Sequence, residues 1–180
     1  MNINIIKKSF LKILAVLVLG ACATPKQQTT PADWVTHYDT IEEMIDQSDF
    51  IVIAKVASQT LEVRVDMVFT MSDLTITTLL KAPEGVSVME LTLLQTGGKT
   101  ADLTTYPIEG VLMLEKGTTY LLFLEMTDEG QVLLMGGYQG AALIRSDKVV
   151  FPDNEAFQVN ELDRVSVDQA ILKIQSLMNK

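Results

Sequence analysis

Apolar and polar residues alternate with a period of two through much of the chain, which is typical of β-strands. In residues 50–56 both alternating sets are largely apolar, which predicts a central strand covered on both faces. In residues 61–70 one set is apolar and the other is mostly polar, which predicts one buried and one exposed face. Residues 71–73 have turn chemistry, and a further strand follows at 74–80.

Shorter runs of the same kind predict more strands, several of them separated by turns that contain glycine. These strands are expected at 88–95, 119–126, 131–138, 141–145 and 148–151, with a short strand or turn at 111–114. Residues 99–110 are polar and lack any periodicity, which predicts a long loop or flap.

Two segments have a helical period instead. Thr40 and Glu43 have the spacing of a capping box, which predicts a short helix whose apolar face carries Ile41, Met44 and Ile45. Near the C-terminus, Ser166 and Gln169 repeat that spacing. The helix that follows has an apolar stripe made of Val167, Ala170, Ile171, Ile174, Leu177 and Met178. Either the domain's own sheet or another protein has to cover this stripe.

The elements therefore run from a short helix through seven or eight strands to an amphipathic helix. This order predicts a mainly β fold, in which an antiparallel sheet forms a small closed or nearly closed barrel. Closure of a sheet removes the exposed edges at which chains would otherwise pair and aggregate.

The N-terminus has the pattern of a signal peptide. Lys7, Lys8 and Lys12 precede or open an apolar run at 13–19, and small residues lead to Cys22. The run is shorter than the roughly 20 residues that span a bilayer. Leu19–Cys22 resembles a bacterial lipobox, which implies cleavage between Ala21 and Cys22 and a diacylglyceryl group on the Cys22 sulfur.

Cys22 is the only cysteine of the chain, which excludes an internal disulfide. The alternative to lipidation is a cut nearby that leaves a free thiol. Residues 22–33 contain no large apolar side chain, which predicts a flexible tether. The expected organisation is a signal peptide at 1–21, this tether, and one domain at 34–180, held at the extracytoplasmic face of the cell membrane by its lipid.

The formal charge of −9 makes nucleic acid an unexpected partner, because phosphate binding needs a basic surface. Loss of the signal peptide removes lysines and no acids, so the mature chain is more acidic still. The simplest interpretation of this charge is solubility.

Three clusters have residue types that suggest chemistry, and each has a simpler explanation. A metal site would use His37, Asp39, Glu42, Glu43 and Asp46, but a single histidine and acids on the outer helix face favour a solvated surface. Residues 153–155 lack the ligand spacing of a calcium loop and favour a turn after Pro152. The glycines of residues 136–140 fit neither phosphate-loop motif and favour a bend or bulge.

Two aromatic residues and a search for catalytic motifs complete the set of candidate functional features. Trp34 and Tyr38 lie where the tether meets the domain, and they either pack the first helix onto the sheet or form a contact patch. We expect no enzyme activity, no metal and no cofactor other than the covalent lipid. The sequence has no Gly-x-Ser-x-Gly motif, and its one histidine has no identifiable partner serine.

Several stretches resemble netrin-like domains of secreted bacterial proteins, which are similar to the inhibitory domain of tissue inhibitors of metalloproteinases. The match covers roughly residues 46–146, and it rests on Ser48-Asp49-Phe50-Ile51-Val52-Ile53-Ala54-Lys55-Val56, Leu79-Leu80-Lys81, Gln95-Thr96-Gly97-Gly98, residues 116–124 and residues 136–140. The resemblance implies an OB-like β-barrel. The inhibitors act through a free N-terminal cysteine amine and are braced by disulfides, so neither their mechanism nor any functional residue carries over to this chain.

The predicted function is therefore that of a lipid-anchored, non-enzymatic module that binds a protein or peptide at the cell surface. Its binding face is expected at the barrel rim and residues 99–110, because long loops on rigid scaffolds usually carry recognition. The alternative is an accessory subunit of an envelope complex that docks through the C-terminal helix, and an enzyme is less favoured.

Overall fold

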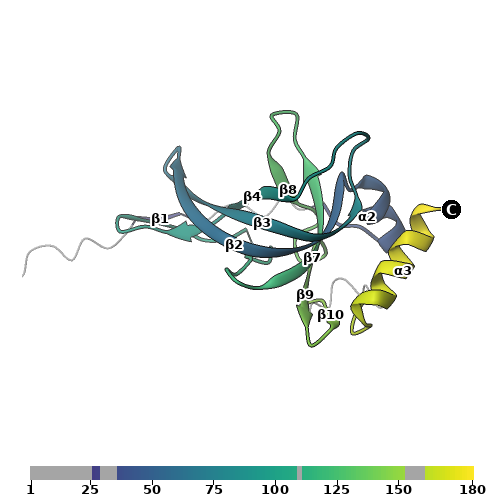
Figure 1. The fold of residues 1–180 in the computed structure, drawn as a ribbon. Helices are drawn as coiled ribbons and strands as arrows, with labels where there is room; N and C mark the ends of the chain where they lie inside the picture. Colours follow the sequence, from purple (N-terminus) through teal and green to yellow (C-terminus); the bar gives the residue numbers. More distant parts are fainter. Residues whose placement is uncertain (1–25, 29–35, 109–110, 153–160) are drawn as a thin grey trace, which may run out of the picture.

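The fold is mainly β, as predicted. In the sequence, one helix precedes the strands of the main sheet and another follows them (Figure 1). The structure is a computed structural model, and it describes residues 26–28, 36–108, 111–152 and 161–180. In these ranges the elements are β1 (Lys26–Gln28), α2 (Ile41–Gln47), β2 (Phe50–Arg64), β3 (Met67–Lys81), β4 (Glu90–Thr96), β5 (Gly98–Lys99), β6 (Leu103–Thr105), β7 (Thr119–Met126), β8 (Val132–Leu134), β9 (Ala141–Arg145), β10 (Lys148–Val150) and α3 (Val167–Met178).

The main sheet has the strand order β10-β9-β7-β2-β3-β4-β8. β8 pairs in parallel with β4 and antiparallel with β7, so the sheet partly closes on itself. β1, β5 and β6 form a separate three-stranded sheet. This small sheet lies at the same end of the molecule as the tip of the β2–β3 hairpin, whereas α3 lies at the opposite end (Figure 1).

The β2–β3 hairpin is longer than the sequence pattern predicts. The expected turn at 71–73 is wrong, because Met71, Ser72 and Asp73 pair along β3 with residues of β2. The chain turns instead at Val65 and Asp66, which both have positive φ and connect Arg64 to its partner Met67. A Val-Asp pair is not a typical sequence for such a turn, since residues with positive φ are usually glycine, asparagine or aspartate.

Two apolar cores lie on opposite faces of the same strands. Side chains of β2 and β7 alternate between them: Ile51 and Phe123 belong to the core under the helices, while Val52 and Leu122 belong to the core inside the partly closed sheet. Residues 50–54 and Val56 are all buried, which confirms the prediction of a strand covered on both faces.

Both helices begin where their capping residues predict. Ser166 and Gln169 form a complete capping box, and Thr40 accepts a hydrogen bond from the Glu43 N–H at 3.1 Å. Glu43 differs in detail, because its carboxylate accepts from the Asp39 N–H at 3.2 Å rather than from Thr40.

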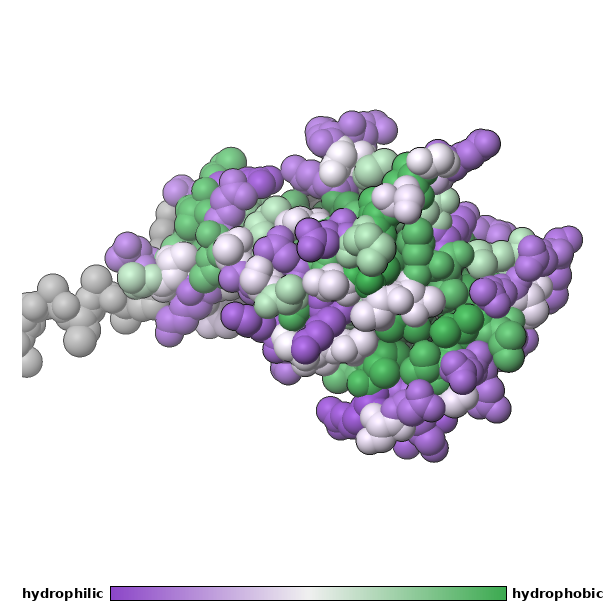
Figure 2. Space-filling model, in the orientation of Figure 1, coloured by the Kyte–Doolittle hydropathy of each residue, from purple (hydrophilic) through white to green (hydrophobic). Residues whose placement is uncertain are grey.

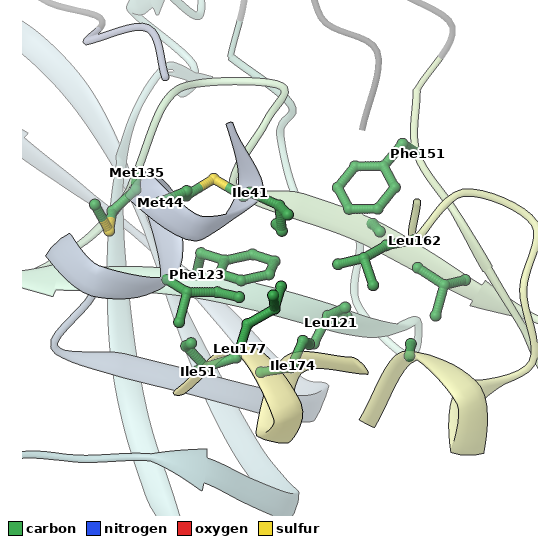
Figure 3. Packing of buried hydrophobic residues seen from close by; sticks show 14 of the residues in the cluster. Ile41, Met44, Ile51, Leu121, Phe123, Met135, Phe151, Leu162, Ile174 and Leu177 are labelled. Atoms are coloured by element: carbon green, nitrogen blue, oxygen red, sulfur yellow. The ribbon is translucent and has the colours of Figure 1, made fainter. Parts of the chain in front are cut away.

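The core under the helices covers the apolar stripe of α3. Figure 3 shows Ile174 and Leu177 of α3 near Phe123 and Ile51 of the sheet, and Met44 of α2 belongs to the same cluster. Ile174 is fully buried, and Ile171 packs against the same core while remaining partly exposed. The domain's own sheet and α2 therefore provide the partner surface that the stripe requires.

The prediction of a loop at 99–110 is wrong for residues 99–105. Gly98 and Lys99 pair with Thr105 and Thr104, so this part is a short β-hairpin. Polar strand residues such as these give no hydrophobic alternation, which is why the sequence pattern misses them. Within the predicted tether, Lys26–Gln28 is a strand that pairs in parallel with Leu103–Thr105.

Smaller differences concern the ends of strands. The strand expected at 131–138 is limited to Val132–Leu134, and turns follow it. Residues 111–114 are neither strand nor turn. Among the described residues, neither helix combines the length and the apolar character needed to cross a membrane.

The left-handed backbone of Val65 gives a test of the hairpin turn. A β-branched residue is disfavoured at φ 47°, so Val65→Asn should raise the free energy of unfolding by about 1 kcal/mol in urea titration. Val63→Asn is the matched control, because Val63 lies in the extended strand beside it and should gain nothing. Equal effects of the two substitutions would argue against this turn.

Candidate functional site

An apolar pocket of about 340 Å³ opens beside the point where β8 joins β4 and β7. Its walls come from the ends of these three strands, from Phe69 of β3 and from irregular segments on both sides. The lining residues are Thr36, Tyr38, Phe69, Leu94, Gln95, Thr96, Ile108, Val111, Glu125, Gln131, Leu133, Leu134, Met135, Gly136 and Gly137. A concave, mostly apolar site with a few polar groups is typical of ligand pockets in proteins.

Buried Gln139 holds one wall of this pocket. Its side-chain amide donates to the Tyr38 carbonyl at 2.8 Å, and its side-chain oxygen accepts from the Tyr38 N–H at 3.0 Å. The segment that precedes α2 is thereby fastened to the turn after β8, across 101 residues of sequence. Because Tyr38 is itself buried, both of its backbone polar groups need such a partner.

Buried Gln95 holds another part of the pocket wall in the same manner. Its amide donates to the Leu112 carbonyl at 2.7 Å, and its oxygen accepts from the Leu114 N–H at 3.1 Å. Gln59 also donates to the Leu114 carbonyl, at 2.9 Å. Residues 111–114, which form no strand of their own, are thus fixed to β4 and β2 by side-chain amides.

Close backbone contacts around Gln139 explain two of the glycines near the pocket. A Cβ on Gly136 would lie 2.7 Å from the Gln139 side-chain oxygen, and φ at Gly136 is +55°. A Cβ on Gly140 would lie only 2.0 Å from the Met135 carbonyl oxygen. The glycine-rich stretch therefore forms a tight turn that brings Gln139 under Tyr38, which agrees with the expected structural role.

Tyr38 and Glu125 are the titratable groups that line the pocket. Partial burial raises the pKa of Glu125, and the neighbouring Asp49 carboxylate adds to this effect. Burial also raises the pKa of Tyr38, with further contributions from Glu125 and Glu43. Asp49 is held in place beside Glu125 by the N–H of Met126, which donates to its carboxylate at 2.7 Å. The pocket thus combines apolar walls with one carboxylate that would gain from a nearby cation or hydrogen-bond donor.

A second, more open groove lies over β2, β3 and β4. Its central acid, Asp73, accepts hydrogen bonds from Ser58 and from Thr92, the latter at 3.0 Å. These hydrogen bonds, led by that from Ser58, lower the pKa of Asp73. The carboxylate is therefore occupied by its own neighbours, and the apolar pocket is the better candidate for a binding site.

The acidic cluster at the first helix does not converge on a metal. His37, Asp39, Glu43 and Asp46 are exposed, and Glu42 is partly exposed. No set of three potential metal ligands comes together in the part of the chain that the structure describes. These side chains form a solvated face, as expected.

Some of the candidate residues named from the sequence lie within the described part of the structure, and others lie outside it. Tyr38 joins the core under the helices and lines the pocket, as part of the packing role proposed for it. Ala21, Cys22, Trp34 and residues 153–155 lie outside the described residues.

Sequence reasoning missed Gln95, Gln139 and Glu125. Gln95 had a signal, because it follows Leu91 and Leu93 at an inward position of β4, where a polar residue is unexpected. Gln139 and Glu125 had none, since their roles depend on contacts with distant segments.

Comparison of the sequence with models of known protein families finds no match, and comparison with curated proteins finds no relative.

The two hydrogen bonds between Gln139 and the Tyr38 backbone can be tested by their effect on stability. Gln139→Ala leaves two buried backbone groups of Tyr38 without partners, so the free energy of unfolding should fall by about 2 kcal/mol in urea titration. Gln47→Ala is the control, because Gln47 is exposed at the end of α2. Similar stabilities of the two variants would mean that these hydrogen bonds contribute little to the free energy of unfolding.

Proposed function

We propose that the protein is a lipid-anchored, extracytoplasmic binding module that holds an apolar side chain of a protein or peptide in its pocket. The observation that carries the binding role is the pocket of about 340 Å³, whose walls are fixed by Gln95 and Gln139. The support for the anchor is the sequence Leu19–Cys22 after a basic start and an apolar run. The location proposed is the outer face of the cell membrane.

The lining of the pocket favours a particular ligand chemistry. An aliphatic or aromatic side chain suits walls that include Leu94, Leu134 and Met135. Glu125 then lies where it can accept from a lysine, arginine or backbone N–H of the same ligand, and a cation there would offset the cost of its partial burial. We therefore expect peptides in which an apolar residue has a basic neighbour.

An OB-like barrel is the proposed finer description of the sheet. In support, β2, β3, β4, β8 and β7 pair in a circuit, in which only the β4–β8 contact is parallel. An OB-fold is likewise a five-stranded, partly open barrel. The netrin-like resemblance points the same way, and it implies nothing about the ligand.

The alternative function, an accessory subunit that docks through the C-terminal helix, has less support. Ala170, Ile174 and Leu177, which would form its docking face, are buried in the core of the domain itself. Another surface would have to serve, and Leu172 is the one large apolar side chain that α3 exposes strongly.

The anchor is tested by Cys22→Ala in a bacterium that processes lipoproteins. The substitution removes the sulfur that would be acylated, so incorporation of a labelled fatty acid should be lost and the protein should be released or kept as a precursor. Membrane fractionation and intact-mass measurement provide the readout. A variant that still carries lipid and sediments with membranes would refute the lipobox assignment.

The pocket is tested by Thr36→Trp, with His37→Trp as the matched control. Thr36 is exposed and lines the pocket, so an indole there should obstruct the mouth, while exposed His37 lies next to it outside the lining. Peptides are first selected from a random library on the immobilised protein. We expect Thr36→Trp to weaken their binding by about tenfold or more and His37→Trp to leave it unchanged. Equal affinities for both variants would exclude this pocket.

A further inference from the structure

The tip of the β2–β3 hairpin carries a row of exposed aliphatic side chains. Leu61 and Val63 lie on one face of β2, Val65 follows in the turn, and their exposed fractions rise toward the tip from 48% through 54% to 95%. Exposed apolar residues are ordinary when they are scattered, but a row of three at a projecting tip indicates contact with an apolar phase or partner.

The turn itself is costly for the isolated protein. Val65 combines a positive φ of 47°, which β-branched residues avoid, with almost complete exposure of an apolar side chain. Neither the backbone conformation nor the contact with water favours valine there. A residue that breaks both local rules is best explained by a function of the tip.

The small sheet places the N-terminal part of the chain at the same end of the molecule. Gly98 of β5 packs beside Leu61, since a Cβ built on it would lie 2.9 Å from that side chain. β5 pairs with β6, and β6 pairs with β1. Neighbouring strands are about 4.8 Å apart, so β1 lies roughly 10 Å from β5 across the sheet. Figure 1 shows the same arrangement, with β1 beside the hairpin and α3 far from it.

The direction of β1 fixes where the chain enters. Because β1 and β6 are parallel, Lys26 pairs with Leu103, next to the turn between β5 and β6, and Gln28 pairs with Thr105, beside Val68. The chain therefore enters from the outer end of the small sheet. Cys22 precedes Lys26 by four residues, which span at most about 14 Å. Lipid on Cys22 would thus hold the hairpin tip close to the bilayer.

The formal charge of residues 61–66 is only −1, although the whole chain is acidic. Arg64 and Glu62 form an ion pair at 2.6 Å, and strand alternation places them on the face of β2 opposite to Leu61 and Val63. Arg64 also lies over the Phe69 ring, 5.8 Å from its centroid. Asp66 then provides the remaining charge of residues 61–66. Figure 2 shows apolar surface at this end of the molecule, bordered by polar residues.

From these observations we infer that the hairpin tip, residues 61–65, inserts its aliphatic side chains into the interface of the bilayer that holds the lipid anchor. The contact rests on the proposed lipidation of Cys22, because the anchor confines the tip to the membrane surface and removes most of the cost of association. A small set of aliphatic side chains that would bind membranes weakly alone is then sufficient to fix the orientation of the domain.

The test places an environment-sensitive fluorophore at the tip of the full-length, lipidated protein. A Val65→Cys variant has one reactive thiol if Cys22 is a thioether, so labelling is specific. The protein is reconstituted in vesicles of phosphatidylethanolamine and phosphatidylglycerol, with and without nitroxide-labelled lipids. Leu172→Cys is the matched control, because Leu172 is also an exposed aliphatic residue but lies on α3 at the opposite end.

We expect the label at residue 65 to shift to the blue, to be quenched by the nitroxide lipids and to be several-fold less quenched by iodide than the label at residue 172. A tip label quenched like the control would overturn the inference. A blue-shifted label that nitroxide lipids do not quench would mean that protein covers the tip, a second copy included, and would also overturn it.

Intact-mass measurement on the same samples separates this inference from the proposed anchor. A chain that carries one label and a lipid, but whose tip stays in water, would refute the membrane contact alone. A chain that carries two labels and no lipid would refute the anchor and, with it, the contact that depends on it.

Discussion

The structure depends on buried glutamine amides that satisfy backbone groups outside regular secondary structure. Residues 111–114 and the segment at Tyr38 form no strands, yet they lie against the sheet where water cannot serve all their N–H and carbonyl groups. Gln95 and Gln139 each offer a donor and an acceptor to one of these segments. Without them the segments would have to move toward solvent, and the pocket between them would lose two of its walls.

The pocket and the hairpin tip both follow from how β3 is paired. β3 is long enough to pair with β2 along its whole length, while β4 pairs only with the part near its N-terminal end, from Phe69 to Thr75. The end of the hairpin, where Val63 pairs with Val68 and Arg64 with Met67, therefore extends past the last pair of β3 and β4 at Phe69. Phe69 itself lines the pocket, so a bound peptide would lie only four residues from Val65. Under the proposed function and the proposed membrane contact, recognition would take place close to the membrane surface.

Capping residues and apolar alternation were sufficient to predict several helices and strands from the sequence. The capping residues Thr40 and Ser166 and the alternation at 119–126 and 141–145 predicted α2, α3, β7 and β9 with correct or nearly correct bounds. The hairpin turn was missed because its Val-Asp sequence obeys no turn rule, and β5 and β6 were missed because they are short and polar. The pocket was beyond reach, since it requires Tyr38 and Gln139 to meet across 101 residues of sequence.

The orientation of the domain links these features. A lipid tether alone leaves a domain free to rotate about its attachment, because a single point of contact fixes no axis. A second contact at the hairpin tip would remove most of that freedom and direct α3 away from the membrane (Figure 1). The strained, exposed Val65 then has a physical explanation: asparagine would suit the turn better, but it would supply no apolar group to the bilayer. Stability at the turn and the proposed attachment at the surface make opposite demands on this position.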